Sequence, residues 1–158
     1  MLQLSHLTKV YPNGTRALDD LSLEIGPGLF GLLGPNGAGK STLMRMIATL
    51  QRPDGGSLHF GQIDLLTQPR LLRQRLGYLP QEFGVYPRVS ALRLLDYFAQ
   101  LKGIASRRER RLRSEEVLRL TNLYAVRRER VDPLSGVMTL RFGISQLLLN
   151  APELFVVY

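Results

Sequence analysis

The sequence predicts an α/β fold that has a β-rich N-terminal part, an inserted helical subdomain and a strand that returns at the end of the chain. Three observations predict it. Alternating apolar residues mark short strands before residue 60, helical periodicity marks most of residues 90–149, and a glycine-rich loop joins an apolar run to a helix around residue 40. With 158 residues, the chain fits one domain.

A hairpin is predicted at the start of the β-rich part. Residues 2–10 and 17–25 have strand patterns, and Pro12-Asn13-Gly14 between them is typical of a turn. After a second turn, the apolar run Leu29–Leu33 is expected to form a short buried strand that leads into the glycine-rich loop.

Helices dominate the remaining pattern. The run STLMRMIATL predicts a helix over 40–50, and Ser90 is a suitable N-cap for a helix that reaches Gly103. Amphipathic spacing predicts two more helices, over 106–120 and 138–149. The other predicted elements are strands at 57–60, 77–81 and 154–157 and a short helix at 70–75.

The loop GPNGAGKST has the pattern G-x-x-x-x-G-K-[ST], which is typical of phosphate binding. Glycines let backbone N–H groups converge on phosphate oxygens, and the following helix adds its positive N-terminal end. Lys40 would place a cation at the β and γ phosphates, and the Ser41 hydroxyl would ligate Mg²⁺. The alternative is a glycine-rich turn before an ordinary helix. The candidate phosphate-binding residues are Gly34, Pro35, Asn36, Gly37, Ala38, Gly39, Lys40, Ser41 and Thr42.

Further motifs in the same order along the chain make the sequence similar to the ATP-binding subunits of ABC transporters. Tyr11 stands where that family places an aromatic residue that stacks on adenine, although an aromatic side chain at a strand end can also simply cap a core. Gln81 resembles the glutamine that reaches Mg²⁺ and the attacking water. The sequence EFGVYP that follows it, at residues 82–87, is similar to the corresponding segment of ATPases that pair with exporter-type permeases.

The run Leu134-Ser135-Gly136 resembles the family's signature motif, and this resemblance implies a homodimer in which Ser135 and Gly136 approach the ATP held by the opposite subunit. A serine hydroxyl and free N–H groups at a helix start suit an anion. The sequence departs from the family at Val137, where the pattern has a second glycine. A β-branched side chain there would obstruct close approach of the backbone to phosphate.

Residues 154–157 resemble the family's Walker B strand, which ends in an aspartate that orients Mg²⁺. Position 158 is a tyrosine, so the resemblance implies a P-loop NTPase-like ABC ATPase core that is incomplete at the C-terminus. The family hydrolyses ATP, but no residue of this chain is assigned a catalytic role. The expected parts are a nucleotide-binding core at 1–82, a helical subdomain at 83–135, and the signature helix with the Walker B strand at 136–158.

The resemblance thus implies an ATP-binding subunit that uses ATP and Mg²⁺ to energise a separate membrane permease of the exporter type. One alternative is a truncated, hydrolysis-deficient nucleotide-binding fragment or interaction module. Another is a nucleic-acid-associated ATPase of the same superfamily, which would call for paired ATPase domains or a long coiled coil.

Composition narrows these classes. The net charge is +8, but Glu109, Glu115 and Glu116 interrupt or follow the arginines of residues 107–113 at helical spacings, as on a solvated helix face, so no nucleic-acid partner is expected. Without cysteines the chain forms no disulfide or thiolate zinc site, and His6 and His59 are interpreted as structural. No signal peptide or spanning segment is recognised, so a cytoplasmic chain is expected, peripheral at the inner face of the plasma membrane when it is partnered.

Overall fold

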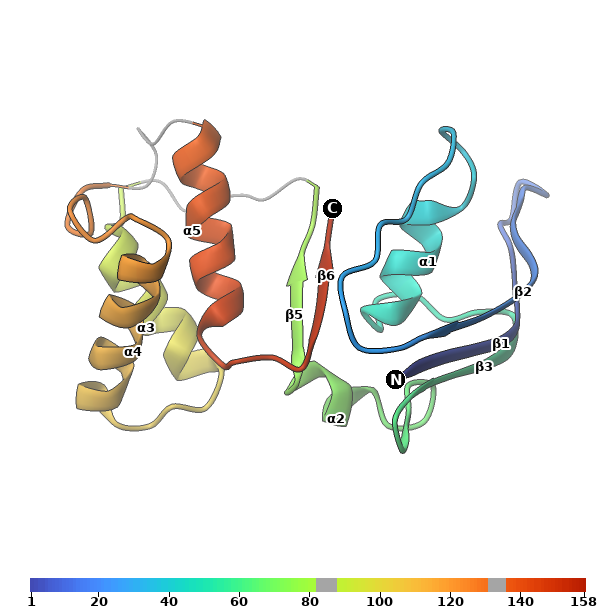
Figure 1. Ribbon diagram of the computed structural model, residues 1–158, viewed down its shortest axis with the longest axis horizontal. Helices are drawn as coiled ribbons and strands as arrows, with labels where there is room; N and C mark the ends of the chain where they lie inside the picture. The colour runs from blue at the N-terminus through green and yellow to red at the C-terminus, as the bar shows by residue number, and fades with distance from the viewer. Residues whose placement is uncertain (82–87, 131–135) are drawn as a thin grey trace. The chain divides into compact units, whose positions relative to one another are not determined.

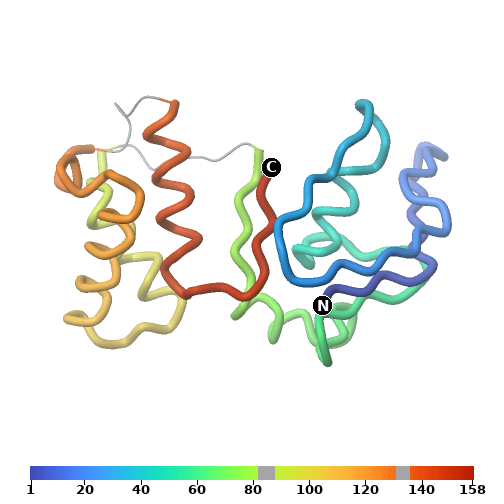
Figure 2. The backbone as a smooth tube through the Cα atoms, in the orientation of Figure 1, coloured from blue at the N-terminus to red at the C-terminus, as the bar shows by residue number. Residues whose placement is uncertain are grey.

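The structure of the chain, a computed structural model, describes residues 1–81, 88–130 and 136–158. They form two compact units, Met1–Arg73 and Gln74–Tyr158, which can be followed along the chain in Figures 1 and 2. Within these described ranges, no helix is both long enough and apolar enough to cross a bilayer.

The first unit contains a four-stranded antiparallel sheet in the order β2-β1-β3-β4. The predicted hairpin is present, because β1 and β2 pair from Leu2 opposite Ile25 to Val10 opposite Arg16. The two-residue strand β4 is too short to leave a periodic pattern in the sequence. The strands are β1 (Leu2–Val10), β2 (Arg16–Ile25), β3 (Gly55–Phe60) and β4 (Ile63–Asp64).

The prediction of a buried strand at Leu29–Leu33 is wrong. The structure assigns no strand to this run, and Leu29 and Leu33 are 101% and 93% exposed. An apolar run shows only that its side chains favour burial, whereas a strand also needs a neighbour that satisfies its backbone N–H and C=O groups. The sheet of the first unit provides no such neighbour, since its four strands pair only with one another.

Two helices complete the first unit, α1 (Lys40–Ile47) and α2 (Pro69–Arg73). Leu43, Met46 and Ile47 of α1 are buried, at the spacing of one helix face. The end of α1 is tied to α2, because the Arg73 guanidinium donates to the Thr49 hydroxyl at 2.8 Å and to the Thr49 carbonyl at 2.9 Å. These bonds fix the segment that directly follows the C-terminal end of α1.

The second unit packs three helices, α3 (Ala91–Leu101), α4 (Arg107–Leu120) and α5 (Gly136–Leu148), around an apolar core (Figure 1). The predicted Ser90 cap is present, because its hydroxyl accepts from the Arg93 N–H. The Ser106 hydroxyl caps α4 in the same way, by accepting from the Glu109 N–H. The largest side chain in this core, Phe142, is fully buried. The other fully or nearly fully buried members are Ala91, Leu94, Leu95, Ala99, Val117, Leu118, Leu123 and Leu149.

The arginine-rich helix α4 has the ion pairs expected of a solvated face. Arg111 and Arg119 lie on either side of Glu115, at 3.1 and 3.5 Å. The hydrogen bond from Arg111 is the main reason why the pKa of Glu115 lies below its usual value. Part of the positive charge of this helix is therefore matched within the helix itself.

Candidate nucleotide-binding site

The glycine-rich loop leads directly into helix α1. Gly37 and Gly39 have φ angles of 85° and 81°, in the left-handed region that favours glycine. The turn is closed by the Ala38 N–H, which donates to the Pro35 carbonyl at 3.3 Å. Residues 34–38 are exposed. The loop is therefore an open turn whose backbone and side chains face solvent at the start of a helix, as an anion site requires.

Gly39 is required for a second reason, which is space. A Cβ atom at this position would lie 2.2 Å from the Ala17 carbonyl oxygen of β2 and 3.1 Å from a methyl group of Leu18. Real Cβ atoms do not approach backbone oxygen this closely. The absence of a side chain at Gly39 thus lets the start of α1 lie against β2, which fixes where the glycine-rich turn ends and the helix begins.

Lys40 folds back over the loop. Its ammonium group donates to the carbonyls of Gly34 and Pro35, each at 2.6 Å. These bonds hold the first and last parts of the loop together and place the cation beside the first residues of the loop. Ser41 follows in the first turn of α1 with an exposed side chain, which suits the metal-ligand role expected of its hydroxyl.

Tyr11 lies next to the helix that follows the loop. Its hydroxyl is 3.0 Å from the Thr42 hydroxyl and 3.2 Å from the amide nitrogen of Gln51. The hydrogen bonds from Thr42 and then from Gln51 are the main causes that lower the pKa of the Tyr11 phenol. The structure thus joins Tyr11 to the loop's last residue, and this contact could not be read from positions so far apart in the sequence.

Gln51 is a site residue that sequence reasoning missed. It follows α1, within the first unit, and its side chain is half-buried against the Tyr11 hydroxyl. No motif marks it, because a single glutamine before the turn at residues 52–56 has no pattern of its own.

In the second unit, Gln81 and Tyr158 follow the carboxyl ends of two paired strands. Strands β5 (Leu76–Leu79) and β6 (Leu154–Val157) are parallel, so the residues after them follow the same, carboxyl edge. Gln81 is exposed there. The Tyr158 N–H donates to the Leu79 carbonyl at 3.2 Å, and its ring meets the Tyr78 ring edge to face at 6.1 Å. A phenol, not a carboxylate, therefore occupies this edge at position 158.

The signature run is only partly described. Leu134 and Ser135 lie outside the described residues, as does the exporter-like run at 82–87. Gly136 is the first residue of α5, and Val137 follows it with its side chain 63% exposed.

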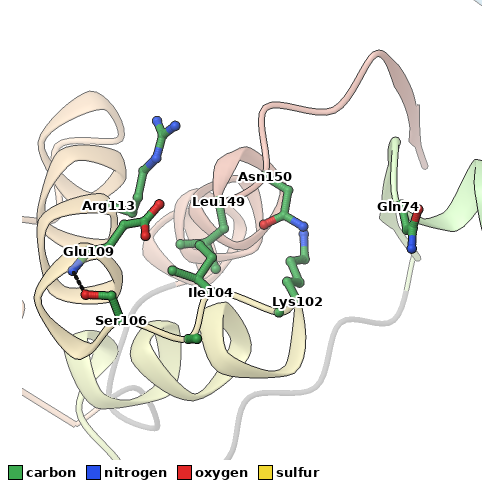
Figure 3. A pocket seen from close by; sticks show the side chains of 10 residues that line it. Gln74, Lys102, Ile104, Ser106, Glu109, Arg113, Leu149 and Asn150 are labelled. Carbon is green, nitrogen blue, oxygen red and sulfur yellow. Dashed lines mark hydrogen bonds between the residues drawn. The ribbon is translucent and has the colours of Figure 1, made fainter.

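A hollow of about 510 Å³ opens on the second unit, and Figure 3 shows residues that line it, among them Lys102, Arg113 and Asn150. None of the site residues predicted from the sequence lines it. Burial lowers the pKa of Lys102, whose ammonium donates to the Gln146 carbonyl at 3.2 Å. The Lys102 ammonium is thus engaged within the second unit itself.

Comparison with known proteins shows the family to which the chain belongs. The model of the ABC transporter family matches residues 18–157. The chain belongs to this family. A solved dimeric ATP-binding cassette, MJ0796 bound to ADP and Pi, matches with a TM-score of 0.85 and 30% identity, over 98% of this chain and 72% of that one. The ABC ATPase cassette fold predicted from the motifs is confirmed.

The names of the relatives of this ABC chain refer to different compounds. The phosphonates import ATP-binding protein of Rhodopseudomonas palustris (strain HaA2) is 37% identical, over 99% of this chain and 60% of the relative. The daunorubicin/doxorubicin resistance ATP-binding protein of Streptomyces peucetius is 38% identical, over 97% of this chain and 46% of the relative. The chain therefore spans about half to three fifths of the length of these two relatives.

Proposed function

We propose that this chain acts as the ATP-binding subunit of an ABC transporter, in which ATP and Mg²⁺ bound at the loop of residues 34–42 energise a separate membrane permease. The observation that carries the proposal is the loop itself, where two left-handed glycines and the Lys40 ammonium lie at the start of α1. The residues fit a nucleoside triphosphate, because residues 34–38 are exposed at the start of a helix and the Lys40 ammonium lies beside them.

Each part of the nucleotide has a candidate partner in this chain. The backbone of residues 34–39 and the Lys40 ammonium would hold the phosphates, and the Tyr11 ring would stack on adenine. Ser41 and Gln81 would supply oxygen ligands to Mg²⁺. Ser135 and Gly136 would approach the nucleotide of a second copy. The dimeric state of the MJ0796 cassette supports this last part of the proposal.

The permease is proposed to be of the exporter type, and the chain to lie at the inner face of the plasma membrane. The support is the sequence EFGVYP at residues 82–87 together with the resistance protein among the relatives. The phosphonates import protein among the relatives supports the opposite alternative, an importer, equally well. Reconstitution with each class of permease, followed by measurement of substrate movement, distinguishes the two directions.

A second candidate function follows from Tyr158. A phenol at the carboxyl edge of β6 gives Mg²⁺ no carboxylate, so the chain would bind nucleotide without hydrolysing it and would act as an interaction module. Phosphate release at saturating ATP distinguishes this candidate from a hydrolytic subunit.

Calorimetry with a non-hydrolysable ATP analogue tests the proposed site. Lys40→Ala removes a charge-assisted contact worth roughly 1.5–3 kcal/mol, so we expect the affinity to fall roughly 10- to 150-fold. Arg70→Ala is the matched control, because Arg70 is an exposed cation of the same unit outside the loop. Equal affinity of the Lys40→Ala variant and the parent would rule out phosphate binding at this loop.

A further inference from the structure

The Tyr11 hydroxyl lies between two side chains that are distant from it in sequence. Thr42 is buried in the first turns of α1, and its hydroxyl oxygen lies 3.0 Å from that of Tyr11. Gln51 approaches with its whole amide: its nitrogen donates to the Tyr11 hydroxyl at 3.2 Å, and its oxygen lies 3.4 Å from it. All three residues belong to the first unit, so their arrangement is internal to one compact body.

These contacts restrict the Tyr11 side chain. A tyrosine has two side-chain torsions, and a hydroxyl held by two partners limits both of them. The ring is half-buried, and the turn of residues 11–15 holds its backbone, since the Tyr11 N–H donates to the Thr15 carbonyl at 2.9 Å. A ring that is already ordered loses little conformational entropy when a base stacks on it.

We propose that Gln51 is a positioning residue for nucleotide binding: together with Thr42, it holds the Tyr11 ring in the orientation that stacks on the base and so increases the preference for ATP over inorganic triphosphate. The inference rests on the proposed function, because it requires that Tyr11 contacts the base. Thr42 connects this ring to the phosphate loop. The residues that would contact the base and the phosphates of the nucleotide are therefore joined by hydrogen bonds.

Gln51 is the informative position to change. Thr42 belongs to the phosphate loop, so its replacement would affect base and phosphates together. Gln51→Leu keeps a side chain of similar size outside the loop and removes both amide contacts. Tyr11→Phe is the matched partner, because it keeps the aromatic face and removes only the hydroxyl that Gln51 and Thr42 share.

The test is calorimetry with a non-hydrolysable ATP analogue and with inorganic triphosphate, on the parent, Gln51→Leu, Tyr11→Phe, the double variant and Tyr11→Ala. Gln51→Leu and Tyr11→Phe are each expected to weaken the ATP analogue roughly 2- to 12-fold, the effect of one net hydrogen bond. Triphosphate affinity should not change. The double variant should be no weaker than Tyr11→Phe alone, because both changes remove the same contact.

Different results contradict different parts of the reasoning. If Tyr11→Ala binds the ATP analogue as tightly as the parent, the base-stacking role in the proposed function fails, and this inference fails with it. If Tyr11→Ala weakens binding but Gln51→Leu does not, only the positioning role is overturned. Equal weakening of the ATP analogue and triphosphate by Gln51→Leu also overturns it, because Gln51 would then support the loop and not the ring.

Discussion

Alanine at Gly39 should destabilise the protein far more than alanine at Gly37, although both glycines have nearly the same backbone conformation. Their φ angles are 81° and 85°, so a side chain at either position costs roughly 1–2 kcal/mol for the left-handed conformation. At Gly37 nothing lies within 4 Å of the added Cβ atom. At Gly39 the Ala17 carbonyl oxygen would lie 2.2 Å away, so α1 must move off the sheet.

Overpacking of this kind typically adds roughly 1–3 kcal/mol to the loss of stability. We therefore expect the free energy of unfolding to fall by about 2–5 kcal/mol for Gly39→Ala and by about 1–2 kcal/mol for Gly37→Ala. Urea unfolding followed by far-UV circular dichroism, without nucleotide, measures both values. Equal losses for the two variants would refute the argument that contact with β2, and not backbone conformation alone, requires glycine at position 39.

Three further predictions concern other parts of the chain. Lys9 lies 2.6 Å from Asp54, and its hydrogen bond is the main cause that lowers the pKa of this carboxyl. Because the folded-state pKa is below the unfolded value of about 3.9, the stabilisation is present above that pH and is lost as the pH falls through the folded-state pKa; acid unfolding curves should show this loss in the parent and not in Asp54→Asn. Thr121→Val should lower the free energy of unfolding by roughly 1–3 kcal/mol, because the buried Thr121 hydroxyl is 2.6 Å from that of Ser145, and chemical denaturation would measure the change. Tyr158→Asp should make binding of the ATP analogue more dependent on Mg²⁺ without producing turnover, since one carboxylate adds a metal ligand but not the group that polarises water; EDTA titration and a phosphate-release assay check the two halves.

Sequence patterns predicted the local elements of this fold well. The periodicity of residues 40–50 and the N-cap Ser90 predicted the helices that the structure has as α1 and α3, because both features depend on neighbouring residues alone. The prediction of a strand at Leu29–Leu33 was wrong, because strand formation depends on whether another strand lies beside the run. The sequence of these five residues does not specify such a neighbour. Strand β4 was missed for another reason, since its two residues are too few to show a periodic pattern.

Some features of the candidate site depend on local sequence and could be predicted, whereas others depend on packing and could not. The glycines of residues 34–39 could be assigned from sequence because their role is conformational and the motif is contiguous. The contact of Tyr11 with Thr42 and Gln51 could not, because it depends on how β1 and α1 pack. For Gly39, the sequence indicated a phosphate loop, but only the structure shows the Ala17 carbonyl that excludes a side chain.

The pairing of β5 with β6 has a consequence for how the chain folds. Leu76 pairs with Leu154, so this pairing closes a loop that contains almost the whole second unit, whereas β1 and β2 are joined by a tight turn. Closing so long a loop is entropically expensive, and contacts that are distant in sequence slow folding. The N-terminal hairpin should therefore gain protection from amide hydrogen exchange early in refolding, and the edge that carries Gln81 and Tyr158 should gain it late.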